Sequence, residues 1–329
     1  MRSKWIIGRR ADLALILGSP LAGYLYLILN VAFQLPFSWL WWVWSVGFDG
    51  THIFAMATRT YLDAGERRKR GTLLWGSLLV FFSVGPLMVL AGLKALLWIV
   101  VGVWAYYHVM RQHYGFLMLY KLKNADLQSK TQDGWFLMLM LTAPPFLRFF
   151  IRSPQELGIP ERFALGRMIP GFEILFWTGL AALTASYLVN LLREDSFNAP
   201  KLMLLGGVIP LHWLTFHYMS WQASVPTVTI VHNLQYHALV WLHNQNKYAA
   251  GTRLGTVPAA VTRSLMLYLA AGLAFSLLYR VPGYYLGQVS DLAFGLFCGF
   301  GLTHYYLDSR IWRLRSDPEL AETLQLRAA

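Results

Sequence analysis

Apolar runs of about 20 residues recur along nearly the whole chain, and each is long enough for a helix to cross a bilayer. Ten windows fit this description, and the count falls to eight or nine if the fifth window, which is short and contains Pro144 and Pro145, is not a full span. The windows are Ala11–Phe33, Phe37–Thr58, Thr72–Ala91, Ala95–Leu119, Trp135–Phe150, Pro170–Leu192, Leu202–Trp221, Val225–Lys247, Val257–Tyr279 and Leu292–Ile311. The sequence therefore predicts an all-α, polytopic transmembrane helical bundle with eight to ten spans, forming one domain over residues 1–329.

Composition agrees with a membrane protein and narrows the classes of partner. Only 13% of the residues are charged and 56% are apolar, whereas soluble domains carry about 25% charged residues. The net charge of +12 comes from basic residues between apolar runs rather than on one face, so nucleic acid is excluded as a partner. Most of these basic residues fall on one side of the predicted topology, which places both termini in the cytoplasm. The single Cys298 excludes four-cysteine metal sites.

Histidines are the main candidates for a functional site. The segment Val231–Asn244, VHNLQYHALVWLHN, is apolar enough to cross a membrane yet contains three imidazoles. Ionisable residues at membrane depth are costly, and histidine is the commonest metal ligand. All nine histidines lie in or at the edge of predicted spans: His52, His108, His113, His212, His217, His232, His237, His243 and His304.

Counting residues from the predicted cytoplasmic span ends gives each histidine a depth in the bilayer. One layer is expected to contain His52, His108, His113, His237 and His304, with His212 at similar depth. The same count places His217 and His232 closer to the outer face. We predict a metal centre with ligands from His52, His108, His113, His232, His237 and His304, and with His212, His217 and His243 as additional candidates.

Three histidine pairs share a spacing of five residues, namely His108 with His113, His212 with His217 and His232 with His237. In a regular α-helix this spacing rotates one side chain by about 140° from the other. Both rings could then bind one ion only if the helix widened locally. We therefore predict a π-bulge within whichever pair chelates.

Charged residues at membrane depth are few, and each has a predicted role beside the metal. Asp308 lies four residues after His304 and is expected to accept the ring N–H that a metal-bound histidine donates. Asp49, three residues before His52, is a second candidate for this orienting role. Arg111 needs either a counter-ion, for which Asp49 and Asp308 are the candidates, or a path to the membrane interface.

Imidazole ligation suits iron, copper, zinc and nickel, so the chemistry must be chosen on other grounds. Zinc commonly activates water, whereas a site within a bilayer is poor in water and accessible to dioxygen and lipids. We therefore favour non-haem iron, with one or two ions. A di-iron lipid desaturase or hydroxylase, which needs an electron donor, is the second hypothesis. The histidines are also compatible with a haem-binding electron-transfer or transport protein and with a proton or solute transporter.

Four blocks on separate predicted spans carry a resemblance to a known family. GFDGTHIFAMATR, AYYHVMRQHYGF, VHNLQYHALVW and LTHYYLDSRIWR resemble, in this order, the histidine blocks of the Brp/Blh family of membrane-bound β-carotene-cleaving dioxygenases. The resemblance implies an all-helical protein whose histidines hold iron and which splits a carotenoid with dioxygen to give retinal. By position it makes His52 the first ligand, His108 the second, and His232 with His237 the last two.

The last block, with His304 and Asp308, matches a C-terminal His-and-Asp motif of that family. The chain departs from the family by spacing its paired histidines five rather than four residues apart, and by its extra spans and histidines. Taken together, the sequence predicts a membrane-embedded non-haem iron oxygenase. It is expected to oxidise or cleave a long hydrophobic substrate, such as a carotenoid, another isoprenoid or a lipid, with dioxygen.

Overall fold

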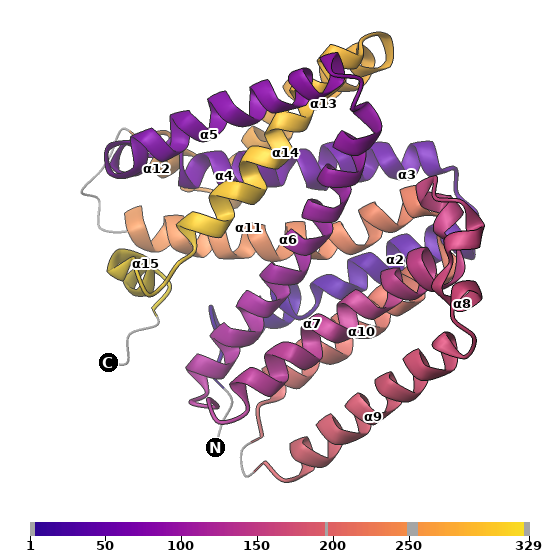
Figure 1. Cartoon of the computed structure of the whole chain (residues 1–329). Coiled ribbons are helices and arrows are strands. Elements are labelled where there is room, and N and C mark those ends of the chain that lie inside the picture. Colours follow the sequence, from indigo (N-terminus) through magenta and orange to yellow (C-terminus); the bar gives the residue numbers. More distant parts are fainter. Residues whose placement is uncertain (1–3, 195–196, 249–255, 326–329) are drawn as a thin grey trace. The chain divides into compact units, whose positions relative to one another are not determined.

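The computed structural model describes residues 4–194, 197–248 and 256–325 (Figure 1). Every regular element in these ranges is a helix, so the all-α prediction is confirmed for the described chain. The longer α-helices are α2 (Ser19–Val31), α4 (Gly50–Arg59), α5 (Ala64–Leu90), α6 (Lys94–Lys123), α7 (Lys130–Phe146), α9 (Phe172–Leu192), α10 (Ala199–Tyr218), α11 (Trp221–Tyr248), α13 (Leu265–Val289) and α14 (Asp291–Ile311). The short ones are α1 (Arg9–Ala11), α3 (Phe37–Trp44), α8 (Leu165–Met168), α12 (Val257–Val261) and α15 (Pro318–Thr323).

Three π-helical segments extend or precede α-helices, and two 3₁₀ turns lie in the segment after α7. The π segments are η1 (Asp12–Ile16), η2 (Ser45–Asp49) and η3 (Leu147–Arg152), and the 3₁₀ turns are η4 (Pro154–Leu157) and η5 (Glu161–Phe163). Pro144 and Pro145 do not end the fifth predicted span, because α7 continues through them into η3.

The helices group into two compact units. Unit 1 comprises residues 1–37 and 110–231, and unit 2 comprises residues 38–109 and 232–329. Helices α6 and α11 each contribute residues to both units. The prediction of a single domain stays a prediction.

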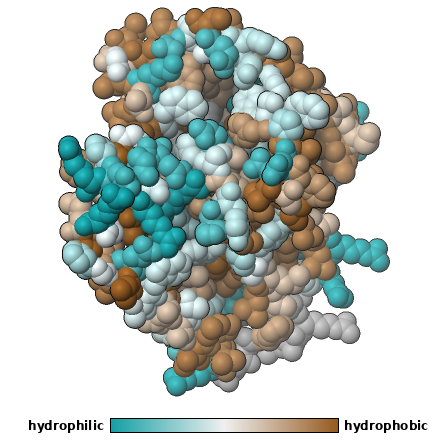
Figure 2. All heavy atoms as spheres, turned by 90° about the vertical axis from the view of Figure 1, so that its right-hand side faces the viewer, coloured by the Kyte–Doolittle hydropathy of each residue, from teal (hydrophilic) through white to brown (hydrophobic). Residues whose placement is uncertain are grey.

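Within the described residues, five helical stretches are long and apolar enough to cross a membrane, as judged by length and composition. They are Arg9–Val31, Ala64–Leu90, Lys130–Arg152, Phe172–Leu192 and Leu265–Val289. Large apolar side chains such as Leu21, Ile174 and Leu278 are more than 70% exposed, and Figure 2 shows hydrophobic residues over much of the visible face. Apolar surface on this scale is uncommon in soluble monomers and is consistent with a membrane protein.

The ninth predicted window is displaced along the chain. Instead of one helix over Val257–Tyr279, the structure has the short α12 and then α13, which begins after Ser264 in extended conformation (φ −141°, ψ 135°). Arg280, which lies outside the ten predicted windows, is therefore part of α13.

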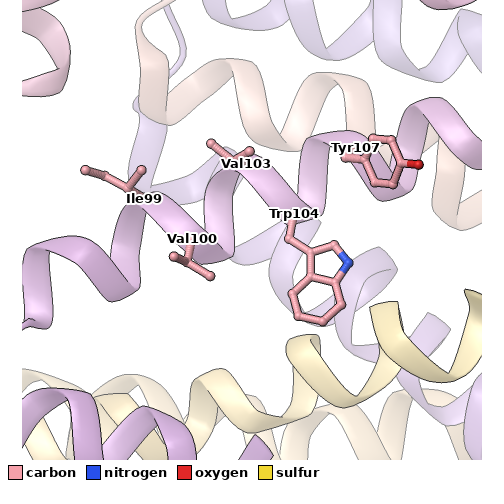
Figure 3. A pocket seen from close by; sticks show the side chains of 5 residues that line it. All are labelled: Ile99, Val100, Val103, Trp104 and Tyr107. Carbon is pink, nitrogen blue, oxygen red and sulfur yellow. The ribbon is translucent and has the colours of Figure 1, made fainter.

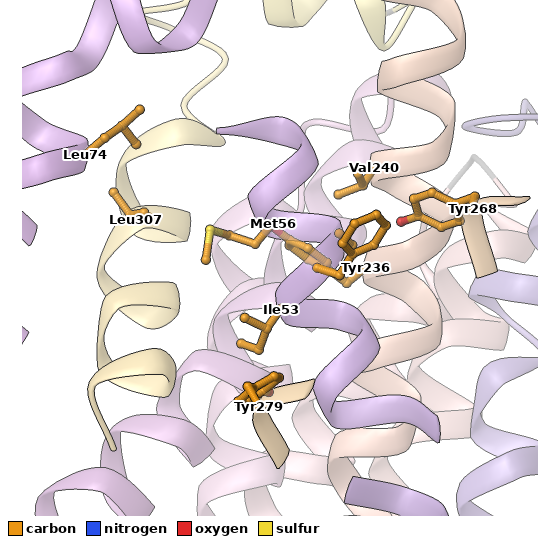
Figure 4. Packing of buried hydrophobic residues seen from close by; sticks show 10 residues of the cluster. Ile53, Met56, Leu74, Tyr236, Val240, Tyr268, Tyr279 and Leu307 are labelled. Carbon is orange, nitrogen blue, oxygen red and sulfur yellow. The ribbon is translucent and has the colours of Figure 1, made fainter. Parts of the chain in front are cut away.

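Unit 2 is built around a buried cluster to which α4, α5, α11, α13 and α14 contribute (Figure 4). Helices α5 and α14 approach most closely at glycines. A Cβ atom on Gly85 would clash with the carbonyl oxygen of Gly295, and one on Gly299 would lie 2.8 Å from the Phe82 ring. The spacing Gly295-x-x-x-Gly299 is typical of close helix contacts in membranes. This contact fixes the helix that carries His304 and Asp308.

Unit 1 contains a buried network of charges rather than a purely apolar core. Lys121 and Lys201 are fully buried, and Lys121 Nζ donates to Asp126 at 2.9 Å and also to Asp133. Lys201 Nζ donates to Glu194 at 2.8 Å and to Asp133 at 3.2 Å. Although three carboxylates here are close enough to suggest a cation site, the two ammonium groups already occupy the positions between them. We therefore interpret this network as structural.

Candidate metal centre

Four imidazoles from four different helices of unit 2 converge in its interior. His52 lies on α4, His108 on α6, His232 on α11 and His304 on α14, and none is more than 8% exposed. The ring centroid of His304 lies 4.6 Å from that of His52 and 4.7 Å from that of His108. The His232 centroid lies 4.8 Å from that of His108 and 5.3 Å from that of His52. Each of the four sequence blocks with histidine motifs thus supplies one ring.

The ε nitrogens of two rings approach the same nitrogen of His304. His304 Nε2 lies 3.1 Å from His52 Nε2 and 3.1 Å from His108 Nε2. A neutral imidazole nitrogen either donates one proton or accepts one, so His304 Nε2 cannot make a good hydrogen bond to both neighbours. Protonating a ring to supply another donor is disfavoured where all three are buried. A cation bound at His304 Nε2 would remove this conflict, with neighbouring ligands from His52 and His232 or from His108 and Asp308.

The spacing of these nitrogens fits a transition-metal ion. Two imidazole nitrogens, each about 2.0–2.1 Å from an ion and subtending about 90–109°, lie about 2.9–3.4 Å apart. The two 3.1 Å separations at His304 fall in this range. His232 belongs to the same group, since ligand atoms of His52, His232 and His304 all lie within 4.8 Å of one another. The donors therefore fit a metal that prefers nitrogen ligands.

Asp308 adds one carboxylate to the four imidazoles. Its Oδ2 lies 3.6 Å from His108 Nε2 and 3.7 Å from His304 Nε2, and its Oδ1 accepts a 2.8 Å hydrogen bond from the Tyr236 hydroxyl. We predicted that Asp308 would accept a ring N–H from behind a ligand. The structure instead places it on the side of the ε nitrogens, where it is a candidate ligand.

Asp49 lies on the opposite side of His52 but is too far away for a hydrogen bond to the ring, so its orienting role stays a prediction. Its Oδ1 is 3.7 Å from His52 Nδ1, the nitrogen that faces away from the other rings. Its other oxygen pairs with Arg280 of α13. Arg111 forms no ion pair with Asp49 or Asp308 among the described residues; it is exposed, as its predicted path to the interface requires, and stacks on Tyr114 with 4.6 Å to the ring centroid.

The predicted π-bulge between His232 and His237 is absent, since α11 is a regular α-helix over Trp221–Tyr248. The two rings accordingly diverge. His237 Nε2 lies 3.0 Å from Thr51 Oγ1 and His237 Nδ1 lies 3.0 Å from the Tyr268 hydroxyl, so both ring nitrogens are engaged by hydroxyl groups. A π segment does occur beside the cluster, but it is η2, directly before the helix that carries His52.

The remaining predicted histidines lie elsewhere. His113 and His212 are buried in unit 1, with ring centroids 5.7 Å apart. His217 is exposed and packs edge-on against Tyr218. His243 is in unit 2 but hydrogen-bonds through Nδ1 to Thr323 Oγ1 at 2.8 Å. These four are not part of the four-histidine cluster.

Aromatic rings surround the cluster and extend to the surface of unit 2. Tyr305 lies with its centroid 5.0 Å from that of His108 and 6.2 Å from that of Trp104. Trp104 lines a shallow apolar pocket of about 400 Å³ on α6 (Figure 3). Its lining residues are Ile99, Val100, Val103, Trp104 and Tyr107. None of the four clustered histidines lines this pocket; Trp104 and Tyr305 are the rings between it and His108.

Comparison with known proteins gives no relative: no family model, curated protein or solved structure matches this chain.

Proposed function

We propose that this protein is a membrane-embedded, non-haem iron oxygenase that oxidises or cleaves a long hydrophobic substrate with dioxygen. The observation that carries the proposal is the pair of 3.1 Å contacts that place the ε nitrogens of His52 and His108 against that of His304. Such a buried, nitrogen-rich donor set with one carboxylate suits redox iron. Iron bound there supplies the capacity to activate dioxygen.

The residues around the donors have distinct tasks in this proposal. His52, His108, His232 and His304 bind the ion, and Asp308 offsets part of its charge while the Tyr236 hydroxyl holds the carboxylate in place. Buried tyrosine rings keep bulk water away from the cluster.

The membrane topology belongs to the same proposal. We propose eight to ten spans with both termini in the cytoplasm, because the basic residues gather on one side of the predicted windows. Five apolar helices support membrane insertion, and the remaining long helices provide candidates for the additional spans.

The substrate class follows from the surroundings of the cluster and from the sequence. Lipid-soluble molecules reach a protein of this kind from the bilayer, and the shallow pocket on α6 is lined by apolar side chains. The resemblance to the Brp/Blh family favours a carotenoid or another isoprenoid. In its support, the four blocks that carry this resemblance supply the four rings of the cluster.

A haem protein is disfavoured by one feature of the cluster. Axial histidines of a haem lie on opposite faces of a planar macrocycle. The rings of His52 and His108 each contact that of His304 directly and leave no space for a macrocycle on that side of His304. The di-iron hypothesis stays a prediction that the metal content will decide.

The test is oxygen-dependent conversion of a carotenoid by purified, iron-loaded protein in detergent. Wild-type protein and His217→Ala, which changes an exposed histidine, should convert β-carotene in air and stop under nitrogen. His304→Ala should be inactive in both atmospheres. Conversion by His304→Ala at the wild-type rate would exclude the proposal, and so would conversion that does not depend on oxygen.

A further inference from the structure

Helix α13 carries none of the four clustered histidines, yet it contacts the helix of His52 on both sides of that residue. Gly50 packs directly on Ser276, because a Cβ atom on Gly50 would clash with the serine side chain. One turn further along, a Cβ atom on Gly272 would lie 3.6 Å from the Thr51 side chain. Such close packing lets polar groups of α13 reach the surroundings of His52.

A chain of hydrogen bonds joins α13 to α4 through His237. The Thr51 hydroxyl donates a hydrogen bond to a backbone carbonyl, that of Phe48 at 2.9 Å or of Gly47 at 3.0 Å. Because its only proton is used there, Thr51 Oγ1 accepts the hydrogen bond from His237 Nε2–H. This assignment leaves His237 Nδ1 unprotonated. Nδ1 therefore accepts from the Tyr268 hydroxyl of α13 at 3.0 Å. Each hydrogen bond from Tyr268 through His237 to Thr51 then has one donor and one acceptor.

A second connection lies on the other side of His52. Arg280 of α13 pairs with Asp49, which faces His52 Nδ1. Two connections thus join α13 to residues near His52. Tyr268 of α13 reaches Thr51 through His237, and Arg280 of α13 pairs with Asp49. The two connections together limit rotation of α4 about its axis.

We propose that His237 is a positioning residue of the metal centre: with Tyr268 and Thr51 it fixes the rotation of α4 and so aims His52 Nε2 at the other ligands. The proposal rests on the proposed metal centre. Metal–ligand distances tolerate changes of only about 0.2 Å, so a small rotation of α4 weakens binding. His237 itself contributes no bond to the ion, which corrects its role predicted from the sequence.

The test compares variants that differ by one hydroxyl group. Tyr268→Phe and Thr51→Val each remove one hydroxyl of the hydrogen-bonded chain. Thr51→Ser keeps the hydroxyl at position 51. Tyr279→Phe is the matched control, because Tyr279 is also buried on α13 and its hydroxyl has no hydrogen-bond partner among the described residues. The iron dissociation constant is measured by competition with a chelator, and the thermal midpoint is measured on the same samples.

We expect Tyr268→Phe and Thr51→Val to bind iron about 10–100-fold more weakly, as is usual when a group that orients a ligand is lost. Thr51→Ser and Tyr279→Phe should bind iron like the wild type. If the hydroxyls of Tyr268 and Thr51 only stabilised the fold, their removal would lower the thermal midpoint, and the iron affinity would not differ between these variants and the controls. Wild-type affinity in both Tyr268→Phe and Thr51→Val would overturn the proposal.

His237→Gln separates positioning from ligation. X-ray absorption of the iron-loaded variant should show the same number of imidazoles around the metal as in the wild type. Loss of one imidazole would make His237 a ligand and overturn the positioning role, while leaving the metal centre intact. If wild-type protein binds no metal, the proposed metal centre fails, and the positioning role fails with it.

Discussion

His52 Nε2 lies 3.1 Å from His304 Nε2, although 252 positions separate the two residues in the chain. Neither nitrogen is exposed, and the second also contacts His108. A fold that brings these nitrogens together without a ligand would carry poorly satisfied polar groups in its core, which is costly. The contact between the two nitrogens is therefore better explained as part of the proposed metal centre than as packing of side chains.

The carboxylate beside the cluster should strengthen metal binding. Asp308→Asn keeps the shape of the side chain and an oxygen for Tyr236 but removes the negative charge near His108 and His304. We expect the iron dissociation constant to rise about 10–100-fold in chelator competition. Tyr236→Phe, which keeps the charge, should have the smaller effect. The reverse order would show that the hydroxyl and not the carboxylate matters.

The glycine contact between α5 and α14 should be sensitive to one methyl group. In Gly295→Ala the new Cβ would lie 2.7 Å from the Gly85 carbonyl carbon, so the helices must separate. We expect a loss of about 1–3 kcal/mol in the free energy of unfolding, together with weaker metal binding through displaced His304. Gly76→Ala on α5 is the control, since its Cβ would meet no described atom within 4 Å. Equal stability of the two variants would contradict the close contact.

The sequence anticipated part of this arrangement for physical reasons. Of the five histidines placed in one layer by counting residues from span ends, His52 and His108 do contact His304. His237 instead contacts Thr51 and Tyr268, and His113 lies beside His212. His232 was placed nearer the outer face and yet joins the cluster, because an error of one helical turn moves a residue by about 5.4 Å. Depth can be read from a sequence only to about this precision.

Rotation about the helix axis was harder to predict than depth. His237 was expected to share a metal with His232 through a widened turn, but a regular α11 directs the rings apart. Arg280 was missed as the partner of Asp49 because the start of its helix, set by the break at Ser264, was misplaced. Side-chain partners between distant helices depend on such details, which hydropathy does not record.

The charge network of unit 1 should contribute strongly to stability. Lys201→Met removes one ammonium group and leaves the buried Asp133 and the partly buried Glu194 with less compensation. We expect a loss of about 3–5 kcal/mol in the free energy of unfolding, measured with denaturant in detergent. Arg167→Met breaks only an exposed pair with Glu161 and should cost about 0–1 kcal/mol. Similar losses in the two variants would show that the buried network stabilises the protein no more than an exposed ion pair does.

Stability should fall at acid pH through Asp63, the N-cap of α5. Burial raises the pKa of the Asp63 carboxyl, but the hydrogen bond and charge of Lys247 at 2.7 Å outweigh burial, and the pKa lies below its ordinary value. A lowered folded-state pKa stabilises the protein above the unfolded value of about 3.9, and this stability is lost as the pH falls further.

Asp63→Asn isolates this charge, because asparagine caps a helix about as well as aspartate. Thermal midpoints measured from pH 7 down to pH 3 should drop less steeply in Asp63→Asn than in the wild type. Asp291→Asn, which changes an exposed pair with Lys94, should follow the wild-type curve. Parallel curves for Asp63→Asn and the wild type would contradict the role of this carboxylate.

The central claim is that the four converging histidines hold a metal ion, and elemental analysis of detergent-purified protein tests it most directly. We expect about one iron per chain in the wild type and in His217→Ala, and almost none in His304→Ala, with all three proteins folded alike. Equal iron content in the wild type and His304→Ala would contradict this claim.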